Sequence, residues 1–181
     1  SRKNIRKVKN LQQKSILLVN AGNANAFTGK EGLIACEEKA LALANAFKCD
    51  KKNIFFASTG VIGEKLPYKK IIQHFDFLKE NLSSSNLKEA SNAILTTDLK
   101  PKTYTSTFKI YNELFTITGF AKGSGMIYPN MATMLAFIFT DFAIDKETLS
   151  SFTRKAVDES FNKISVDGDT STSDSVFVST T

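Results

Sequence analysis

Residues 118–141 constrain the fold of this chain more strongly than any other stretch. Gly123, Gly125 and Pro129 interrupt the backbone, and the apolar run MLAFIF follows them at 134–139. Glycine and proline favour turns, and a short apolar run bounded by them is typical of a buried strand. The sequence therefore predicts a loop that opens into a buried strand over residues 133–140.

Strand and helix patterns alternate along the rest of the chain. Short apolar runs predict strands at 16–20, 53–58 and 175–179. Runs rich in threonine and aromatic residues predict a β-hairpin at 103–110 and 114–121. Helical spacing and start signals predict helices that begin near Thr28, Pro67, Leu87 and Asp145. This mixture of strands and helices favours a layered α/β fold, of the mixed α+β class, over a sandwich or a helix bundle.

Two of these helices carry specific predictions. Thr28 and Glu31 have the spacing of a capping box, and the first helix is expected to end near Lys48. Its predicted apolar face consists of Leu33, Ala40, Leu41, Ala44 and Phe47. The second helix, from Pro67, has an apolar stripe at Ile71, Phe75, Leu78 and Leu82. It also contains the only histidine, His74, which we interpret as structural because it lies away from every glycine-rich loop.

The composition indicates a packed globular protein, because 42% of the 181 residues are apolar. No apolar run approaches the ~18 residues of a membrane-spanning helix, so no membrane association is predicted. The net charge of +6 comes from the first fourteen residues, because the 18 basic residues beyond them balance the 18 acidic ones. One basic segment is more typical of a solvated edge than of a nucleic-acid-binding face. The alternative, a basic nucleic-acid module, predicts steeply salt-dependent DNA binding.

Two features of the sequence contain residue types that bind metal ions, but neither matches the pattern of a known metal site. Cys36 and Cys49 lack flanking Cys or His ligands, so we expect free thiols in a reducing compartment. The acidic loop VDGDTSTSD, with Asp167, Asp169 and Asp174, lacks the glycine at the sixth position and the glutamate at the twelfth position of a calcium-binding loop. It also comes too late in the chain for the D-x-D-x-S nucleophile of a phosphotransferase. We therefore expect no metal, and we interpret the loop as structural or near the site.

Thr133 stands where the predicted loop meets the predicted strand, directly after the small residue Ala132. A hydroxyl in this position suits an N-terminal nucleophile, which forms when an enzyme cuts its own backbone before a Thr, Ser or Cys. The freed amine then serves as the base, because its unperturbed pKa of ~7.7–8.0 lies close to neutral pH. On composition alone, an ordinary β-branched strand residue is the commoner interpretation.

Two other positions offer chemistry of a less specific kind. Thr59 and Gly60 follow an apolar strand in ASTGVIG, where a turn can present hydrogen-bond donors to an oxyanion. By itself this pattern predicts only a turn. Lys122 precedes Gly–Ser–Gly without the Walker pattern of a phosphate loop, and a lysine there is most often a surface charge.

The segment KGSGMIYPNMATML, at 122–135, closely resembles the self-cleavage segment of the ornithine acetyltransferase (glutamate N-acetyltransferase) family of arginine biosynthesis. Further segments resemble that family in the same order: VNAGNANAFTGKEGL (19–33), STGVIGEKLP (58–67), ILTTDLKPK (94–102) and SVDGDTSTSDSV (165–176). These segments are distributed over nearly the whole chain. The resemblance therefore does not depend on a single motif.

The resemblance implies specific residue roles. The backbone would be cut between Ala132 and Thr133, and Thr133 would be the nucleophile. Thr59 and Gly60 would form the oxyanion hole. Lys122 and Thr96 would contact the substrate together with Thr133, although Thr97 is an alternative to Thr96. Residues 1–181 would belong to one catalytic α/β domain and resemble the middle of the family protein, with 1–132 ending an α chain and 133–181 starting a β chain.

The resemblance also implies the activity. An acetyl group would move from N-acetylornithine to glutamate through acetyl-Thr133, without a metal or organic cofactor. Some family members also acetylate glutamate from acetyl-CoA, and the sequence leaves that point open. The two chains would assemble as an α2β2 heterotetramer in the cytoplasm, with neither nucleic acid nor membrane as a partner. The alternative is a related self-processing N-terminal-nucleophile aminopeptidase or amidohydrolase, which would release the acyl group to water.

Overall fold

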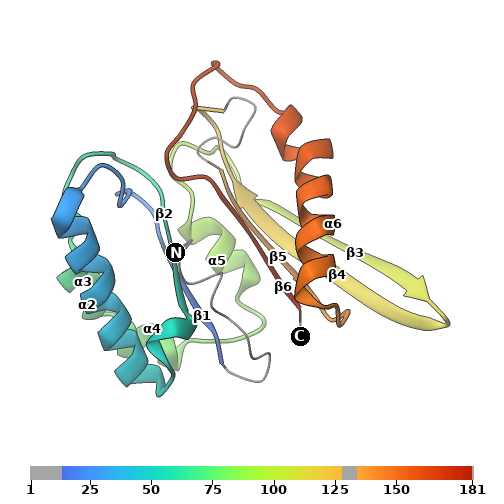
Figure 1. Ribbon diagram of the computed structural model, residues 1–181, viewed down its shortest axis with the longest axis horizontal. Helices are drawn as coiled ribbons and strands as arrows, with labels where there is room; N and C mark the ends of the chain where they lie inside the picture. The colour runs from blue at the N-terminus through green and yellow to red at the C-terminus, as the bar shows by residue number, and fades with distance from the viewer. Residues whose placement is uncertain (1–13, 128–133, 181) are drawn as a thin grey trace. The chain divides into compact units, whose positions relative to one another are not determined.

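The computed structural model describes residues 14–127 and 134–180 (Figure 1). The predicted cleavage site at Ala132 and Thr133, and the predicted start of the strand there, lie outside the described residues. The chain divides into two compact units, Ser1–Asn86 and Leu87–Thr181, and each unit has its own sheet and helices. The prediction that all of the chain belongs to one catalytic domain remains a prediction.

The first unit is built on two parallel strands, β1 (Ile16–Asn20) and β2 (Ile54–Ser58), with Ile16 opposite Ile54. Helix α2 (Gly29–Phe47) and the 3-10 turn η1 (Lys51–Asn53) connect the two strands. Two short helices follow, α3 (Tyr68–Ile72) and α4 (Phe75–Glu80). Leu43 of α2, Ile54 of β2 and Phe75 of α4 form the buried centre of this unit, so these three elements share one core. Both predicted strands are confirmed.

Helix α2 ends where the sequence predicts, with Lys48 in the left-handed region at φ 51°, but its buried face agrees only in part with the predicted one. Its buried residues are Gly32, Ala35, Lys39, Ala40 and Leu43. The predicted core residues Leu33 and Leu41 are 69% and 55% exposed. The prediction was therefore correct for Ala40, which is buried, and for Ala44 and Phe47, which pack against the core, but wrong for the two leucines. The Lys39 stem is buried instead, and its Nζ lies 4.5 Å from the centroid of the Phe56 ring.

The predicted capping box at the start of α2 is not formed. The Thr28 hydroxyl makes no capping bond to the helix and donates instead to Asn25 Oδ1 at 2.9 Å. Glu31 forms an exposed ion pair with Lys65, at 2.7 Å. The side chain of Asn25 also donates to the Gly32 carbonyl at 3.0 Å, so local side-chain bonds replace the expected cap.

The helix predicted from Pro67 is interrupted and becomes α3 and α4. The break falls at Gln73 and His74, so the expected continuous stripe does not form. Phe75 is buried, whereas Leu78 and Leu82 are 41% and 70% exposed. His74 is exposed, and its Nδ1 lies 2.8 Å from the Lys70 carbonyl oxygen. This position agrees with the structural interpretation of His74.

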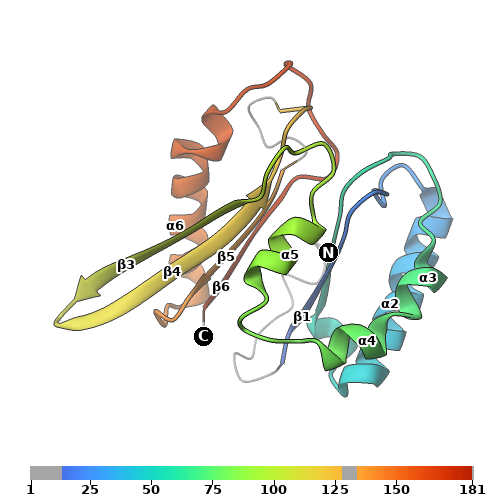
Figure 2. The same ribbon diagram turned by 180° about the vertical axis from the view of Figure 1, so that it is seen from behind.

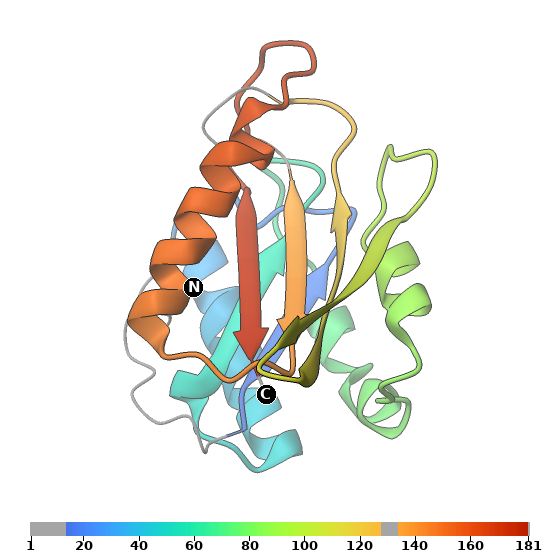
Figure 3. The ribbon, with the colours of Figure 1, turned by 90° about the vertical axis from the view of Figure 1, so that its right-hand side faces the viewer.

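The second unit contains a four-stranded sheet in the order β3-β4-β5-β6 (Figure 3). β3, β4 and β5 are antiparallel neighbours, and β6 runs parallel to β5. The strands are β3 (Lys102–Ile110), β4 (Glu113–Lys122), β5 (Leu135–Thr140) and β6 (Ser175–Thr180). The other elements are α5 (Leu87–Ala93), α6 (Lys146–Glu159) and η2 (Phe161–Lys163). Figures 1 and 2 show α5 and α6 on opposite sides of this sheet.

Local chemistry explains these elements. Tyr111 and Asn112 have φ of 46° and 70°, the conformation of a tight two-residue hairpin turn between β3 and β4. Asp145 caps α6 by accepting hydrogen bonds from two backbone N–H groups, at 3.0 and 2.9 Å. The Phe137 ring lies 5.0 Å from that of Phe120 and 5.6 Å from that of Phe177, centroid to centroid. The predicted hairpin, helix start and mixed α/β fold are confirmed.

Candidate active site

Several of the predicted site residues lie at one end of the four-stranded sheet. Lys122 is the last residue of β4 and pairs with Leu135, the first residue of β5. Leu135 pairs in turn with Ser175, the first residue of β6. Figure 3 shows β5 and β6 beginning at the end of the sheet where β4 finishes. β3 also starts there, with Lys102 opposite Ala121.

Lys122 is a buried cation and not a surface charge. Only 2% of the residue is exposed, and its Nζ donates a hydrogen bond to Thr96 Oγ1 at 2.8 Å. Thr96 itself is exposed and lies in the connection between α5 and β3. The structure therefore brings two predicted substrate contacts together. The choice between Thr96 and Thr97 as the substrate contact stays a prediction.

The pKa of Lys122 reflects opposing influences. Burial lowers its pKa below the ordinary value, because the ammonium loses water that would stabilise its charge. The carboxylates of Asp98 and Asp174 act in the opposite direction and favour the charged form. Lys102 adds a like charge that lowers the pKa again. The Lys122 ammonium is thus surrounded by side chains of both positive and negative charge.

Asp98 is the acidic residue of this cluster that the sequence analysis did not single out. Its side chain is fully buried, and Oδ1 accepts hydrogen bonds from the Gly123 N–H at 2.8 Å and from Lys102 Nζ at 2.6 Å. Burial works to raise the Asp98 pKa, but these bonds and the charges of Lys102 and Lys122 outweigh it and hold the pKa low. A signal was present in the sequence, because Asp98 follows Thr96 and Thr97 within a segment that resembles the family.

Asp174 connects the acidic loop to the start of β5. Its Oδ1 accepts a hydrogen bond from the Met134 N–H at 2.8 Å, and the next residue, Ser175, donates its N–H to the Met134 carbonyl at 3.0 Å. Burial raises the pKa of Asp174 to about 6, against the opposing influence of the Met134 N–H and the Lys122 charge. Residue 134 is therefore bound through both of its backbone polar groups.

Asp167, in the same acidic loop, binds backbone N–H groups earlier in the chain. Its carboxylate accepts from the Met126 N–H at 2.8 Å and from the Ile127 N–H at 3.3 Å. Within the residues that the structure describes, no group of three His, Cys, Asp or Glu side chains is placed to hold a metal ion. The loop thus holds the chain at 126–127 through Asp167 and at 134 through Asp174.

Thr59 and Gly60 lie in the first unit, directly after β2. Thr59 is 1% exposed, and its backbone N–H donates to the Asn20 carbonyl at 3.0 Å. Gly60 has φ 126°, and a Cβ there would clash with the backbone of Gly22 and Asn23. The turn therefore requires glycine, and any donor that Thr59 offers to an oxyanion is its hydroxyl.

The asparagine-rich segment after β1 supports this turn. The Ser58 hydroxyl donates to Asn20 Oδ1 at 2.9 Å, and Asn20 Nδ2 donates to the Asn23 carbonyl at 2.8 Å. Backbone bonds from Ala24 N–H to the Val61 carbonyl, at 2.8 Å, align the two loops. These bonds hold the loop after β1 against the turn after β2.

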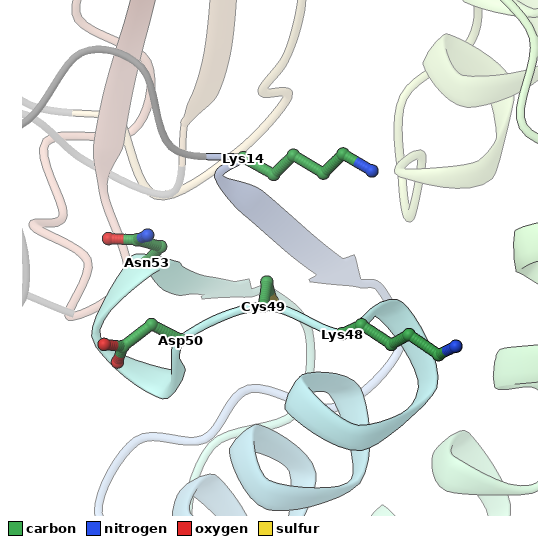
Figure 4. A pocket seen from close by; sticks show the side chains of 5 residues that line it. All are labelled: Lys14, Lys48, Cys49, Asp50 and Asn53. Carbon is green, nitrogen blue, oxygen red and sulfur yellow. The ribbon is translucent and has the colours of Figure 1, made fainter.

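A separate pocket of about 240 Å³ lies in the first unit (Figure 4). It is lined by Lys14, Lys48, Cys49, Asp50 and Asn53. Burial and the neighbouring Asp50 carboxylate raise the pKa of the Cys49 thiol, so this pocket does not offer a thiolate at neutral pH. None of the residues predicted to act in catalysis lines it. Cys36 and Cys49 are both free thiols, as predicted.

The described helices include none that is long and apolar enough to cross a membrane.

The predicted site residues that the structure describes divide into two groups. Thr96 and Lys122 are bonded to each other in the second unit, and Thr59 and Gly60 form a braced turn in the first.

Comparison with known proteins tests the resemblance directly. The chain is 48% identical over 162 residues to the arginine biosynthesis bifunctional protein ArgJ of Bartonella henselae, a match covering 90% of this chain and 40% of that protein. It is 45% identical over 177 residues to the glutamate N-acetyltransferase of Methanocaldococcus jannaschii, covering 94% of this chain and 43% of that protein. The chain therefore spans about two fifths of the length of these curated relatives.

A solved structure agrees with the sequence comparison. The crystal structure of the arginine biosynthesis bifunctional protein ArgJ from Bacillus halodurans matches with a TM-score of 0.60 and 34% identity. The match covers 72% of this chain and 69% of that one. The family model described as ArgJ family matches residues 1–181. The predicted resemblance is confirmed, and the chain belongs to the ArgJ family.

Proposed function

We propose that this protein is a glutamate N-acetyltransferase, an acyltransferase of arginine biosynthesis that moves the acetyl group of N-acetylornithine to glutamate. The observation that carries the proposal is the hydrogen bond from buried Lys122, at the end of β4, to exposed Thr96, in a chain of the ArgJ family. A buried ammonium with a hydroxyl partner is a suitable site for a substrate carboxylate. Both N-acetylornithine and glutamate carry an α-carboxylate.

Thr133 is the proposed nucleophile. Its hydroxyl oxygen attacks the acetyl carbonyl carbon, and the carbon–nitrogen bond to ornithine breaks to leave acetyl-Thr133. The Thr133 α-amine takes the hydroxyl proton and passes it to the departing ornithine nitrogen. In the second half-reaction the glutamate α-amine attacks the ester carbonyl, and N-acetylglutamate leaves as the Thr133 hydroxyl is restored. Neither half-reaction oxidises or reduces a group, so the scheme does not require a redox cofactor.

Thr59 and Gly60 are the proposed oxyanion hole. The Thr59 hydroxyl and the Gly60 N–H would donate to the negative oxygen that develops on the acetyl carbonyl. Loss of one such donor typically costs ~3–4 kcal/mol of transition-state stabilisation. Support for this role comes from the braced turn, because Gly60 lies against Gly22 and Asn23 with no room for a side chain.

Lys122 and Thr96 are the proposed substrate-binding residues. The ping-pong scheme requires one pocket for both substrates, whose side chains differ in sign: ornithine is cationic and glutamate anionic. The shared α-carboxylate is therefore the better partner for Lys122. The neighbouring carboxylates of Asp98 and Asp174 favour the charged form of Lys122.

The nucleophile arises by self-cleavage between Ala132 and Thr133 in this proposal, so residues 1–132 and 133–181 come to belong to different chains. Those chains would assemble as an α2β2 heterotetramer in the cytoplasm. Whether acetyl-CoA is a second acetyl donor can be measured as the formation of N-acetylglutamate from glutamate and acetyl-CoA in the absence of N-acetylornithine.

The decisive experiment measures the release of ornithine from N-acetylornithine with and without glutamate. A transferase releases ornithine in step with the formation of N-acetylglutamate. Release at the same rate without glutamate, with free acetate as the product, would show instead that water is the acceptor. That result would favour the alternative, an aminopeptidase or amidohydrolase of related fold.

A further inference from the structure

We propose that Asp98 is a positioning residue for substrate binding, which fixes the end of β4 and keeps the Lys122 ammonium in place for the substrate carboxylate. The inference rests on the proposed function, because it assigns Asp98 to the same carboxylate-binding step. It concerns a residue for which no role was expected from the sequence.

The connection between α5 and β3 binds the end of β4 at two points. Thr96 accepts from the side chain of Lys122 at 2.8 Å, and Asp98 accepts from the backbone N–H of Gly123, the next residue, also at 2.8 Å. One hydrogen bond therefore orients the ammonium, and the other fixes the backbone from which that side chain extends. A short segment that binds both is well placed to set the position of Lys122.

Asp98 also has the charge that this role requires. Its side chain is fully buried, and Lys102 Nζ lies 2.6 Å from the same oxygen that binds Gly123. The second oxygen, Oδ2, is buried and has no hydrogen-bond partner among the described residues. A buried carboxylate oxygen without a partner is costly, so its retention calls for an explanation. We assign it to the electrostatic support of Lys122.

Among the described residues, Lys122 and three charged neighbours act at this end of the sheet, and they are not equivalent. Asp98 lies before β3, Lys102 begins β3, Lys122 ends β4 and Asp174 precedes β6. The Asp98 pKa is held low, so its charge persists across the neutral range, whereas the Asp174 pKa of about 6 makes that charge depend on pH. Asp98 is therefore the constant negative charge beside Lys122, and Lys102 is the opposing positive one.

The test is a double-mutant cycle in the full-length protein with Asp98→Asn, Lys122→Met and the two together. Asparagine retains an oxygen that can accept from the Gly123 N–H but removes the charge. We expect Asp98→Asn to raise the KM for N-acetylornithine and for glutamate by about tenfold with little change in kcat, a typical coupling within one charged network. In the Lys122→Met background, Asp98→Asn should have no further effect.

The dependence of KM on alkaline pH gives a second measurement. Asp98 raises the Lys122 pKa and Lys102 lowers it. The KM should rise at alkaline pH as Lys122 loses the proton that gives it its charge. Asp98→Asn should therefore shift this rise to lower pH, and Lys102→Met should shift it to higher pH. If Asp98 and Lys102 only stabilised the fold, the two substitutions would not shift the pH dependence of KM in opposite directions. If Asp98→Asn does not fold, the shift measured with Lys102→Met still tests the proposal.

Asp145→Asn is the matched control, because Asp145 also accepts backbone N–H bonds in this unit but caps α6. Its kinetics should match those of the unmodified protein. An unchanged KM in Asp98→Asn, or an equal effect with and without Lys122, would overturn the inference while the proposed function stands. Absence of acetyl transfer by the unmodified protein would instead refute the proposed function itself.

Discussion

The carboxylate of Asp174 accepts a hydrogen bond from the backbone N–H of Met134, at 2.8 Å. Met134 directly follows Thr133 in the sequence, and Asp174 directly precedes β6. The bond therefore connects the residue after the proposed nucleophile to the residue just before β6, forty positions further along the chain. It also gives the acidic loop a definite structural purpose.

The burial of Asp174 leads to a prediction for the stability of the protein. Because burial raises the Asp174 pKa from an unfolded value of ~3.9 to about 6, the folded state keeps a proton over this interval that the unfolded state has released. The free energy of unfolding should therefore fall as pH rises from 4 to 7, relative to Asp174→Asn, in which this titration is absent. Urea denaturation of both proteins at several pH values measures the difference. A difference that is constant with pH would contradict the raised pKa.

Self-cleavage is the second prediction. The full-length protein should separate into two polypeptides at the Ala132–Thr133 bond, and Thr133→Ala should remain one chain because the attacking hydroxyl is lost. Intact-mass spectrometry of both proteins measures this directly. Continued cleavage of Thr133→Ala at the same bond would rule out Thr133 as the nucleophile.

The third prediction concerns the oxyanion. Thr59→Ala should slow acetyl transfer by more than about tenfold, because a donor to the developing charge is removed. The protein should remain folded, as judged by circular dichroism and thermal unfolding. Thr105→Ala is a suitable control, because Thr105 is exposed and bonds only across the β3–β4 hairpin in the described contacts. Normal turnover by folded Thr59→Ala would remove Thr59 from the site.

The fourth prediction separates the two groups that Lys122 can meet. Lys122→Met keeps most of the stem and removes the charge, so it should raise the KM for N-acetylornithine and for glutamate by similar factors. Steady-state kinetics with each substrate varied in turn measures both values. Lys109→Met, at an exposed position on β3, controls for the loss of a positive charge.

The outcomes for Lys122→Met discriminate between models. A raised KM for glutamate alone would show that Lys122 binds the side-chain carboxylate. An unchanged KM for both substrates would remove Lys122 from substrate binding and leave it a structural cation.

The strands and the hairpin could be predicted because their patterns are local. The β3–β4 hairpin follows from two β-rich runs around Tyr111 and Asn112, and the cap of α6 follows from Asp145. The burial of Lys39 on α2 could not be predicted from the same kind of pattern. Burial of Lys39 depends on the Phe56 ring, which β2 supplies from a distant part of the sequence.

The candidate site shows the same division. Motifs identify Lys122 and Thr96, because these residues stand in segments with a recognisable order. They do not identify Asp98 as their support, because its bonds to Gly123 and Lys102 exist only after the chain before β3 has folded against the end of β4. Hydrogen-bond partners far apart in sequence are a tertiary property.

The pairing of β4 with β5 has a consequence for the protein after the proposed cleavage. A cut before Thr133 would place β4 in one polypeptide and β5 and β6 in the other, so the junction between the two products would be a row of backbone hydrogen bonds inside a sheet. Only Met134 would separate the new chain end from β5. The products would then be inseparable without unfolding, and the maturation of the enzyme would break a covalent bond without releasing a fragment.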